Sequence, residues 1–353
     1  MTQARTVDVL TDRRMTEHRP HAGHPERPER LVSVLNRLER NGIWSRCGHP
    51  AFAAASREQL ERVHKTAMID RVQRTSESGG GYLDHGDTSV SSGSWLAATL
   101  AAGCAIGAVD SVMTGSSEAA MAVVRPPGHH ATRSQSMGFC IFNNVAVAAA
   151  HAIERYGLER VLIVDFDVHH GNGTEDIFTE DPRVTFFSTH QYPAYPGTGA
   201  AQYRGTGSGT GDTVNCPLPP GTGDRGFVRV YEKLLVPVAE RLRPQLILVS
   251  AGYDAHWRNS TYVAGIDERV SIEAFFEIAV LLLQLSDLYC PGRLAGVLEG
   301  GYDLEALSCG VAATLDAWLG EEHCDDPIGP SPRPERDAGI DDMIDEVKSI
   351  HSL

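Results

Sequence analysis

The chain has 353 residues, of which 42% are hydrophobic and 22% are charged, so it can bury a large core in one or two domains. Its 46 acidic residues exceed its 31 lysines and arginines, and the net charge of −15 argues against a partner bound through a nucleic-acid backbone. The seven cysteines contain no C-x-x-C pair and the first 15 residues lack an apolar signal segment, so we expect reduced thiols and a cytoplasmic protein.

Short apolar runs rich in β-branched residues recur along the chain and predict strands that are buried on both faces. In chain order they are residues 7–10, 121–125, 161–165, 184–188, 246–250 and 295–299. Segments with helical character are residues 31–40, 95–113, 143–156, 225–242, 271–288 and 341–353. This alternation predicts the α/β class, with a mostly parallel sheet and helices on both of its faces.

We expect a catalytic domain over residues 1–320 and a C-terminal extension over 321–353, packed on the domain or trailing from it. The apolar stretch at 95–109 is short, rich in small residues and followed by Asp110, so we expect a buried helix rather than a membrane span.

Polar, glycine-rich segments follow five of the predicted strands. They read RPPGHH, DFDVHHGNG, STHQYPAYPGTG, SAGYDAH and EGGYD. In parallel α/β sheets, ligands bind beyond the carboxyl ends of the strands. The sequence therefore predicts one shared crevice that these five segments line.

The segment DFDVHHGNG indicates a metal site. Asp167 and His169 are two residues apart, so on a strand they point to the same side, which Asp165 shares. A carboxylate and an imidazole suit zinc, and Asp254 is the natural third ligand. Asp165 would then hold a neighbouring histidine in orientation. Two alternatives stay open: a polar network without metal, and an arginase-like pair of metals that uses all four residues.

Two further features indicate catalysis. His129 and His130 lie in a Pro/Gly-rich loop and suit general acid–base chemistry near neutral pH. Tyr302 follows two glycines, where its hydroxyl can stabilise an oxyanion. Near the N-terminus, the histidines at 18, 21 and 24 suggest either a second metal site or, more simply, a loop that leads into the helix at 31–40.

In this order, RPPGHHA, MGFCIFNN, DFDVHHGNGT, SAGYDAH and EGGYDL resemble the zinc-dependent histone deacetylase superfamily, and HPERPER also fits. The resemblance covers roughly residues 5–320 and is closest to the class II branch and its bacterial relatives, which include acetylpolyamine amidohydrolases. It implies an arginase/deacetylase-type fold with the active site at the carboxyl ends of the strands and one catalytic Zn²⁺.

The resemblance also implies a role for each matching residue. By position, Asp167, His169 and Asp254 match the zinc ligands, His129 and His130 match the tandem active-site histidines, and Tyr302 matches the oxyanion tyrosine. Asp165 matches the carboxylate that orients the first histidine, and together with Ser188 it matches a structural K⁺ site. Phe139 and Tyr195 match the aromatic walls of an acyl-lysine tunnel, which Gly138 would help to line. Asn172 stands where many relatives have a second carboxylate, so His130 should be held less strongly as imidazolium.

The implied reaction is hydrolysis of an N-acetyl amide to acetate and a free amine. Acetyl-lysine in proteins or peptides is the preferred substrate class, and acetylpolyamines or another small acetylated amine are the alternative. Polyamine-specific relatives carry a glutamate that aligns roughly with Thr261, and threonine cannot pair with a distant ammonium. A non-catalytic acyl-lysine binder is the rival of another class. We expect no nucleic-acid or membrane partner. The sequence leaves open the natural substrate, the acyl chain length, zinc versus iron, and the oligomeric state.

Overall fold

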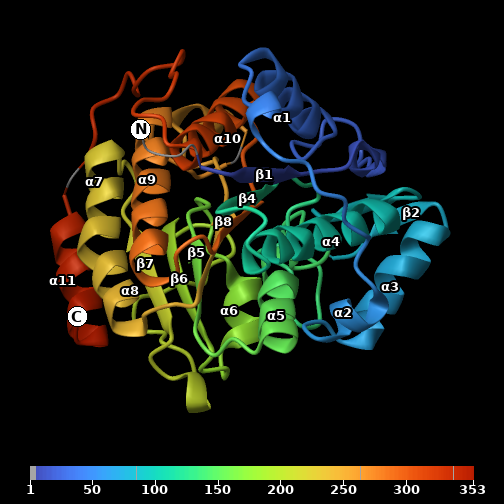
Figure 1. Ribbon diagram of the computed structural model, residues 1–353, viewed down its shortest axis with the longest axis horizontal. Coiled ribbons are helices and arrows are strands. Elements are labelled where there is room, and N and C mark those ends of the chain that lie inside the picture. The colour runs from blue at the N-terminus through green and yellow to red at the C-terminus, as the bar shows by residue number, and fades with distance from the viewer. Residues whose placement is uncertain (1–4, 85, 263, 337) are drawn as a thin grey trace.

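The computed structural model describes residues 5–84, 86–262, 264–336 and 338–353. At its centre is a seven-stranded sheet in the order β1-β4-β9-β8-β5-β6-β7, in which every neighbouring pair is parallel (Figure 1). A separate antiparallel ribbon pairs β2 with β3. The strands are β1 (Val7–Leu10), β2 (Gly80–Tyr82), β3 (Ser89–Ser91), β4 (Ala119–Ala122), β5 (Val161–Asp165), β6 (Val184–Gln191), β7 (Thr213–Leu218), β8 (Leu246–Ala251) and β9 (Leu294–Leu298).

Helices cover both faces of the large sheet. They are α1 (Glu29–Arg40), α2 (Arg57–Glu61), α3 (Thr66–Glu77), α4 (Ser94–Met113), α5 (Asn144–Tyr156), α6 (Asn172–Phe178), α7 (Asp224–Val230), α8 (Val236–Leu242), α9 (Ile272–Tyr289), α10 (Leu304–Leu319) and α11 (Ile340–His351). On one face α4 packs against β1, β4 and β9 while α5 packs against β8. On the other, α9 and α10 pack against each other and α1 covers α10 (Figure 1). This is the layered α/β architecture that the alternating pattern predicts.

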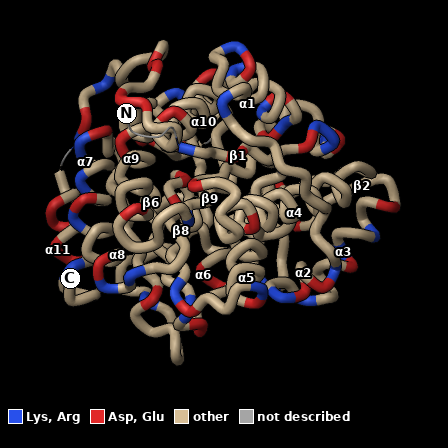
Figure 2. Tube along the Cα trace, viewed as in Figure 1, with Lys and Arg blue, Asp and Glu red and all other residues tan. Residues whose placement is uncertain are grey.

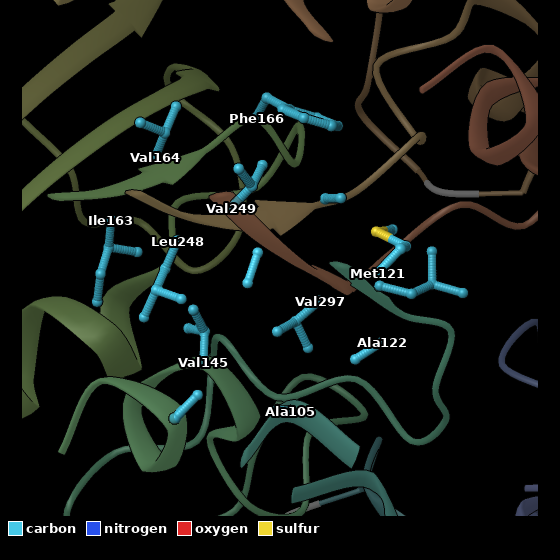
Figure 3. Close-up of a cluster of buried hydrophobic side chains, with 14 of the residues drawn as sticks. Ala105, Met121, Ala122, Val145, Ile163, Val164, Phe166, Leu248, Val249 and Val297 are labelled. Carbon is cyan, nitrogen blue, oxygen red and sulfur yellow. The ribbon is translucent and has the colours of Figure 1, made fainter. Parts of the chain in front are cut away.

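The core lies between the sheet and these helices. Figure 3 shows Ile163 and Leu248 on the side of Val145 from α5, whereas Val164 and Val249 point to the opposite side. All are completely buried, because successive residues of a central parallel strand face the two helical layers in turn. All seven cysteines are free and all but Cys324 are buried, as expected for reduced core residues.

Helix α4 is, within the described residues, the one helix long and apolar enough to cross a membrane. However, 78% of its apolar window is buried inside the protein. Its small residues permit this packing: a side chain at Gly103 would lie 2.0 Å from the carbonyl oxygen of Ala53. The prediction of a buried helix is thus confirmed.

The observed elements differ from the expected ones in several places. The strand expected at 121–125 begins at Ala119 and ends at Ala122, before the polar loop that it feeds. The helix expected at 225–242 is divided by a π-helical turn, Tyr231–Leu235. Pro237 follows this turn and lacks the N–H that would continue the regular hydrogen-bond ladder. Helix α10 was absent from the expected set.

The C-terminal segment lies against the rest of the chain. Helix α11 packs on β7, the last strand of the sheet, and on the π-helical turn before α8 (Figure 1). Division of the chain at residue 320 stays a prediction.

A buried ionic cluster joins the N-terminal segment to the sheet. Most charged residues lie around the outside of the molecule in Figure 2, yet Glu26, Arg30 and Arg125 are at most 1% exposed. Arg125 donates to both carboxylate oxygens of Glu26, at 2.9 and 2.8 Å, and Arg30 donates at 3.2 Å. Burial alone would raise the pKa of Glu26, but Arg125, His18 and Arg30 hold it well below its usual range. Glu26 is therefore an ionised carboxylate on which two buried arginines depend.

We predict that Glu26→Ala lowers the free energy of unfolding by about 3–5 kcal/mol, because it leaves two buried arginines without their carboxylate. Equilibrium denaturation measures this loss. Glu39→Ala is the matched control, since Glu39 pairs with Arg13 at 3.0 Å on the surface, with both side chains largely exposed, and its removal should leave stability almost unchanged. Similar losses in the two variants would contradict this account of the cluster.

Candidate active site and metal centre

The polar segments that follow β4, β5, β6, β8 and β9 converge beyond the carboxyl ends of these strands, as the sequence predicts. Strands β5 and β8 are neighbours in the sheet, with Asp165 opposite Ser250 at their ends. Strand β9 lies between β8 and β4. The segments that carry the two histidines, the two aspartates and the tyrosine therefore leave the sheet side by side.

Three of the residues predicted to bind metal form one buried group. Ligand atoms of Asp167, His169 and Asp254 all lie within 4.8 Å of one another. His169 Nδ1 is 3.1 Å from Asp167 Oδ1 and 3.2 Å from Asp254 Oδ2. The strand geometry expected for this group is wrong, because β5 ends at Asp165. A turn brings Asp167 and His169 together instead, and the His169 N–H donates to Asp167 Oδ1 at 2.9 Å.

This group fits a divalent cation. Two carboxylates and one imidazole are donors that zinc accepts. Asp254 Oδ2 is buried and accepts no hydrogen bond, so the acceptor is left for a cation. Space for the carboxylates depends on Gly300, where a side chain would lie 2.3 Å from Asp254 Oδ2 and 2.4 Å from Asp167 Oδ2. The Gly300 N–H also donates to Asp167 Oδ2 at 2.8 Å.

Asp165 lies outside this group and binds a histidine, as predicted. Its Oδ2 is 3.0 Å from His129 Nδ1, and its Oδ1 accepts from the Asp167 N–H at 3.1 Å. Both oxygens are therefore engaged, which favours a single metal over the arginase-like pair. Asp165 is also opposite Ser188 across β5 and β6. The expected K⁺ site at these two residues stays a prediction.

The tandem histidines have opposite electrostatic surroundings. Burial lowers the pKa of His129, but the carboxylates of Asp165 and Asp167 outweigh this and raise it to about 10. Burial also lowers the pKa of His130 well below its usual range, and the positive charge of His129 lowers it further. His130 Nδ1 is 2.8 Å from Asn172 Oδ1, a neutral acceptor. The two surroundings therefore move the pKa values of these adjacent imidazoles in opposite directions.

Tyr302 is held near these groups by its backbone. The Tyr302 N–H donates to Asn259 Oδ1 at 2.7 Å, and the side-chain amide of Asn259 donates to the Tyr253 carbonyl at 3.0 Å. Burial raises the pKa of Tyr302 well above its usual range, so the phenol stays protonated and can donate. Sequence analysis assigned no role to Asn259, and the structure shows that its side chain braces the Tyr302 backbone.

The three tunnel residues surround the catalytic side chains. The ring of Phe139 packs edge-on against Tyr302 at 5.8 Å, and Tyr195 packs edge-on against His130 at 5.1 Å between centroids. Gly138 separates the two walls at a positive φ of 57°. A side chain there would lie 2.4 Å from the His130 ring, so this position admits only glycine without displacing the histidine.

Two functional contacts were missed by sequence reasoning. Arg30 donates to the carbonyls of Gly301 at 2.6 Å and Glu299 at 2.5 Å, and so fixes the loop before Tyr302. Glu299 accepts from the backbone of the histidine loop. Both lie inside the motifs HPERPER and EGGYD, where charged residues beside apolar strands were the available signal.

The N-terminal histidines do not form a metal site in the described residues. His18 binds Ser94 Oγ and faces Glu26, and both ring nitrogens of His24 lie near backbone carbonyl oxygens. A second group of possible ligands, His129, Cys140 and Glu299, lies within 4.8 Å. His129 Nδ1 and Glu299 Oε2 are hydrogen-bonded there, while Glu299 Oε1 has no hydrogen-bond partner.

Comparison with known proteins agrees with this geometry. Residues 24–318 match the family described as "Histone deacetylase domain". The chain is 40% identical over 350 residues to histone deacetylase 14, chloroplastic, of Arabidopsis thaliana, covering 94% of this chain and 81% of that one. It is 39% identical to the human polyamine deacetylase HDAC10 over 84% of this chain, but spans only 45% of that protein.

A solved structure supports the same assignment at the level of the fold. The crystal structure of the HDA15 HD domain superposes with a TM-score of 0.88 at 33% identity, over 98% of this chain and 94% of that one. The seven-stranded parallel sheet is accordingly of the arginase/deacetylase type. With a matched family domain over most of its length and relatives at 40% identity, the chain belongs to the histone deacetylase family.

Proposed function

We propose that this protein is a zinc-dependent amidohydrolase that removes the acetyl group from acetyl-lysine in proteins or peptides. The observation that carries the proposal is geometric: His129, held by Asp165, and His130, held by the neutral acceptor Asn172, lie beside a buried group of three metal-ligand residues. Opposed pKa values in adjacent titratable groups are the usual mark of acid–base catalysis.

Zinc held by Asp167, His169 and Asp254 would supply Lewis-acid polarisation of the amide carbonyl and lower the pKa of water. Iron in the same ligand set would serve the same purpose, and the donor types alone do not discriminate strongly between them.

The chain's own residues perform the proton transfers. Asn172 Oδ1 accepts from His130 Nδ1, so that ring carries its proton on Nδ1 and keeps a lone pair on Nε2. In the proposed mechanism His130 Nε2 takes a proton from the attacking water and returns it to the leaving amine. Tyr302 donates its hydroxyl hydrogen bond to the developing oxyanion, and His129, held by Asp165, contributes positive charge.

The rim of the site supports a peptide over a small polyamine. A groove of about 720 Å³ is lined by residues 19–29 together with Thr261 and Tyr262. It adjoins the tunnel, since the ring of His24 packs on Phe139 at 4.4 Å. The exposed hydroxyl of Thr261 donates to the Arg258 carbonyl and offers no charge to a distant ammonium. The groove beside the tunnel has no carboxylate at position 261. It can therefore hold the residues of a substrate peptide on either side of its acetyl-lysine.

A small acetylated amine is the second candidate substrate, and the observation in its favour is similarity to a relative named polyamine deacetylase. The acidic residues Asp84 and Asp87 lie near Tyr195, since both raise the pKa of its phenol together with the larger effect of burial. A cationic substrate would gain attraction there.

We predict that Asn172→Asp moves the acidic limb of the pH profile of kcat/KM upward by about one pH unit. A carboxylate that accepts from His130 Nδ1 stabilises the imidazolium and raises the pKa of His130, so the neutral base forms only at higher pH. The profile is measured from about pH 4 to 9, a range that extends below the ordinary titration of histidine because burial lowers the pKa of His130. Asn172→Ala is the control, since it removes the acceptor without adding charge. An unshifted limb in an active Asp variant would rule out His130 as the base.

We predict a kcat/KM for an acetyl-lysine peptide about tenfold above that for N-acetylspermidine and N-acetylputrescine, or roughly 1.4 kcal/mol of transition-state discrimination. The three substrates are compared on one zinc-loaded preparation. Thr261→Glu should narrow the difference by adding a partner for the ammonium. A preference of the wild type for the small amines would replace the peptide proposal with the second candidate.

Tyr302→Phe serves as the control for catalysis in that assay. Loss of an oxyanion donor should reduce kcat by about 10²–10³-fold, whereas a non-catalytic acyl-lysine binder would retain its affinity and show no turnover in either form.

A further inference from the structure

One buried carboxylate adjoins the tandem histidines without a part in the proton transfers. Glu299 follows β9 directly and its side chain is inaccessible to solvent. Its Oε2 accepts from two consecutive backbone amides, Gly128 N–H at 2.6 Å and His129 N–H at 3.0 Å. Its Oε1 is buried and has no hydrogen-bond partner. Burial of a carboxylate costs free energy that two amide hydrogen bonds offset only in part, so stability is a poor explanation for this side chain.

The backbone around Glu299 is fixed independently of its side chain. Arg30 donates to the Glu299 carbonyl at 2.5 Å, and the next residue, Gly300, donates its N–H to Asp167 Oδ2 at 2.8 Å. Strand β9 is hydrogen-bonded on both sides, to β4 and β8. The Glu299 side chain thus connects a fixed stretch of backbone beside the metal ligands to the loop that carries the tandem histidines.

We propose that Glu299 is a positioning residue: its carboxylate holds the Gly128–His129 backbone at a set distance from the metal ligands, so that His130 and Tyr302 meet the same amide. The inference rests on the proposed function, because only hydrolysis needs both side chains at one substrate. A displacement of about 1 Å in such a group costs on the order of 10²-fold in rate.

Glu299 positions the histidine loop through the location of its acceptor oxygen rather than through its negative charge. Burial raises the pKa of Glu299 to about 7, although the charge of His129 and the two amide hydrogen bonds oppose the shift. A neutral side chain of the same length that still offers an oxygen should therefore replace it. A charged but shorter one should not, since it cannot reach both amides.

The test compares Glu299→Gln with Glu299→Asp in the zinc-loaded full-length protein, by kcat, KM and metal content. We expect Glu299→Gln to keep kcat within about tenfold of the wild type. We expect Glu299→Asp to lose about 100-fold in kcat, the rate cost of displacing a catalytic group by about 1 Å. KM should stay within about threefold, and one metal per chain should be retained.

Leu298→Ala is the matched control for destabilisation of the same strand, because Leu298 is buried and, within the described residues, forms no hydrogen bond with the histidine loop. It should lower Tm and keep kcat. Wild-type kcat in Glu299→Asp would overturn the proposal. A loss in Glu299→Gln as large as that in Glu299→Asp would also overturn it, because glutamine keeps an acceptor oxygen at the same reach. Absence of acetate release from the wild type itself would instead refute the proposed function.

Discussion

The active site depends on the buried carboxylate of Glu26. It neutralises Arg125, which lies in the loop between β4 and the tandem histidines. It also neutralises Arg30, which donates hydrogen bonds to carbonyls of the loop after β9. Two segments nearly 180 residues apart thus share one ionic centre. Arginine is suited to this task because its planar fork makes several hydrogen bonds in fixed directions while buried. The catalytic loops can be irregular because this cluster, rather than regular secondary structure, holds their first residues.

Beside this ionic cluster, electrostatic surroundings give the two neighbouring histidines different pKa values. Asp165 keeps His129 charged, and the same charge helps to keep His130 neutral. A neutral amide at Asn172 orients His130 without opposing this effect. Glycines complete the arrangement, since Gly138 and Gly300 leave room for an imidazole and for two carboxylates that any side chain would displace. Charge and steric space therefore both determine how the imidazoles and the metal-binding carboxylates are placed.

Much of this could be predicted from the sequence. Buried parallel strands are visible as β-branched runs, and ligands of parallel α/β sheets bind beyond the carboxyl ends of the strands. The grouping of Asp167, His169 and Asp254 therefore followed from β5 and β8. The turn after Asp165 could not be predicted, since alternation assumes that the strand continues. Helix α10 was missed because it has no clear periodic pattern. Glu299 and Arg30 act through long-range backbone contacts, which no local pattern encodes.

The central claim is that one metal, held by three protein ligands, supports amide hydrolysis at this site. The most direct test measures metal content per chain and acetate release together, in the wild type and in Asp254→Ala. The account predicts one tightly bound ion per wild-type chain, and loss of both the ion and acetate release in the variant. Two tightly bound ions per chain, or acetate release that persists after the metal is removed, would contradict it.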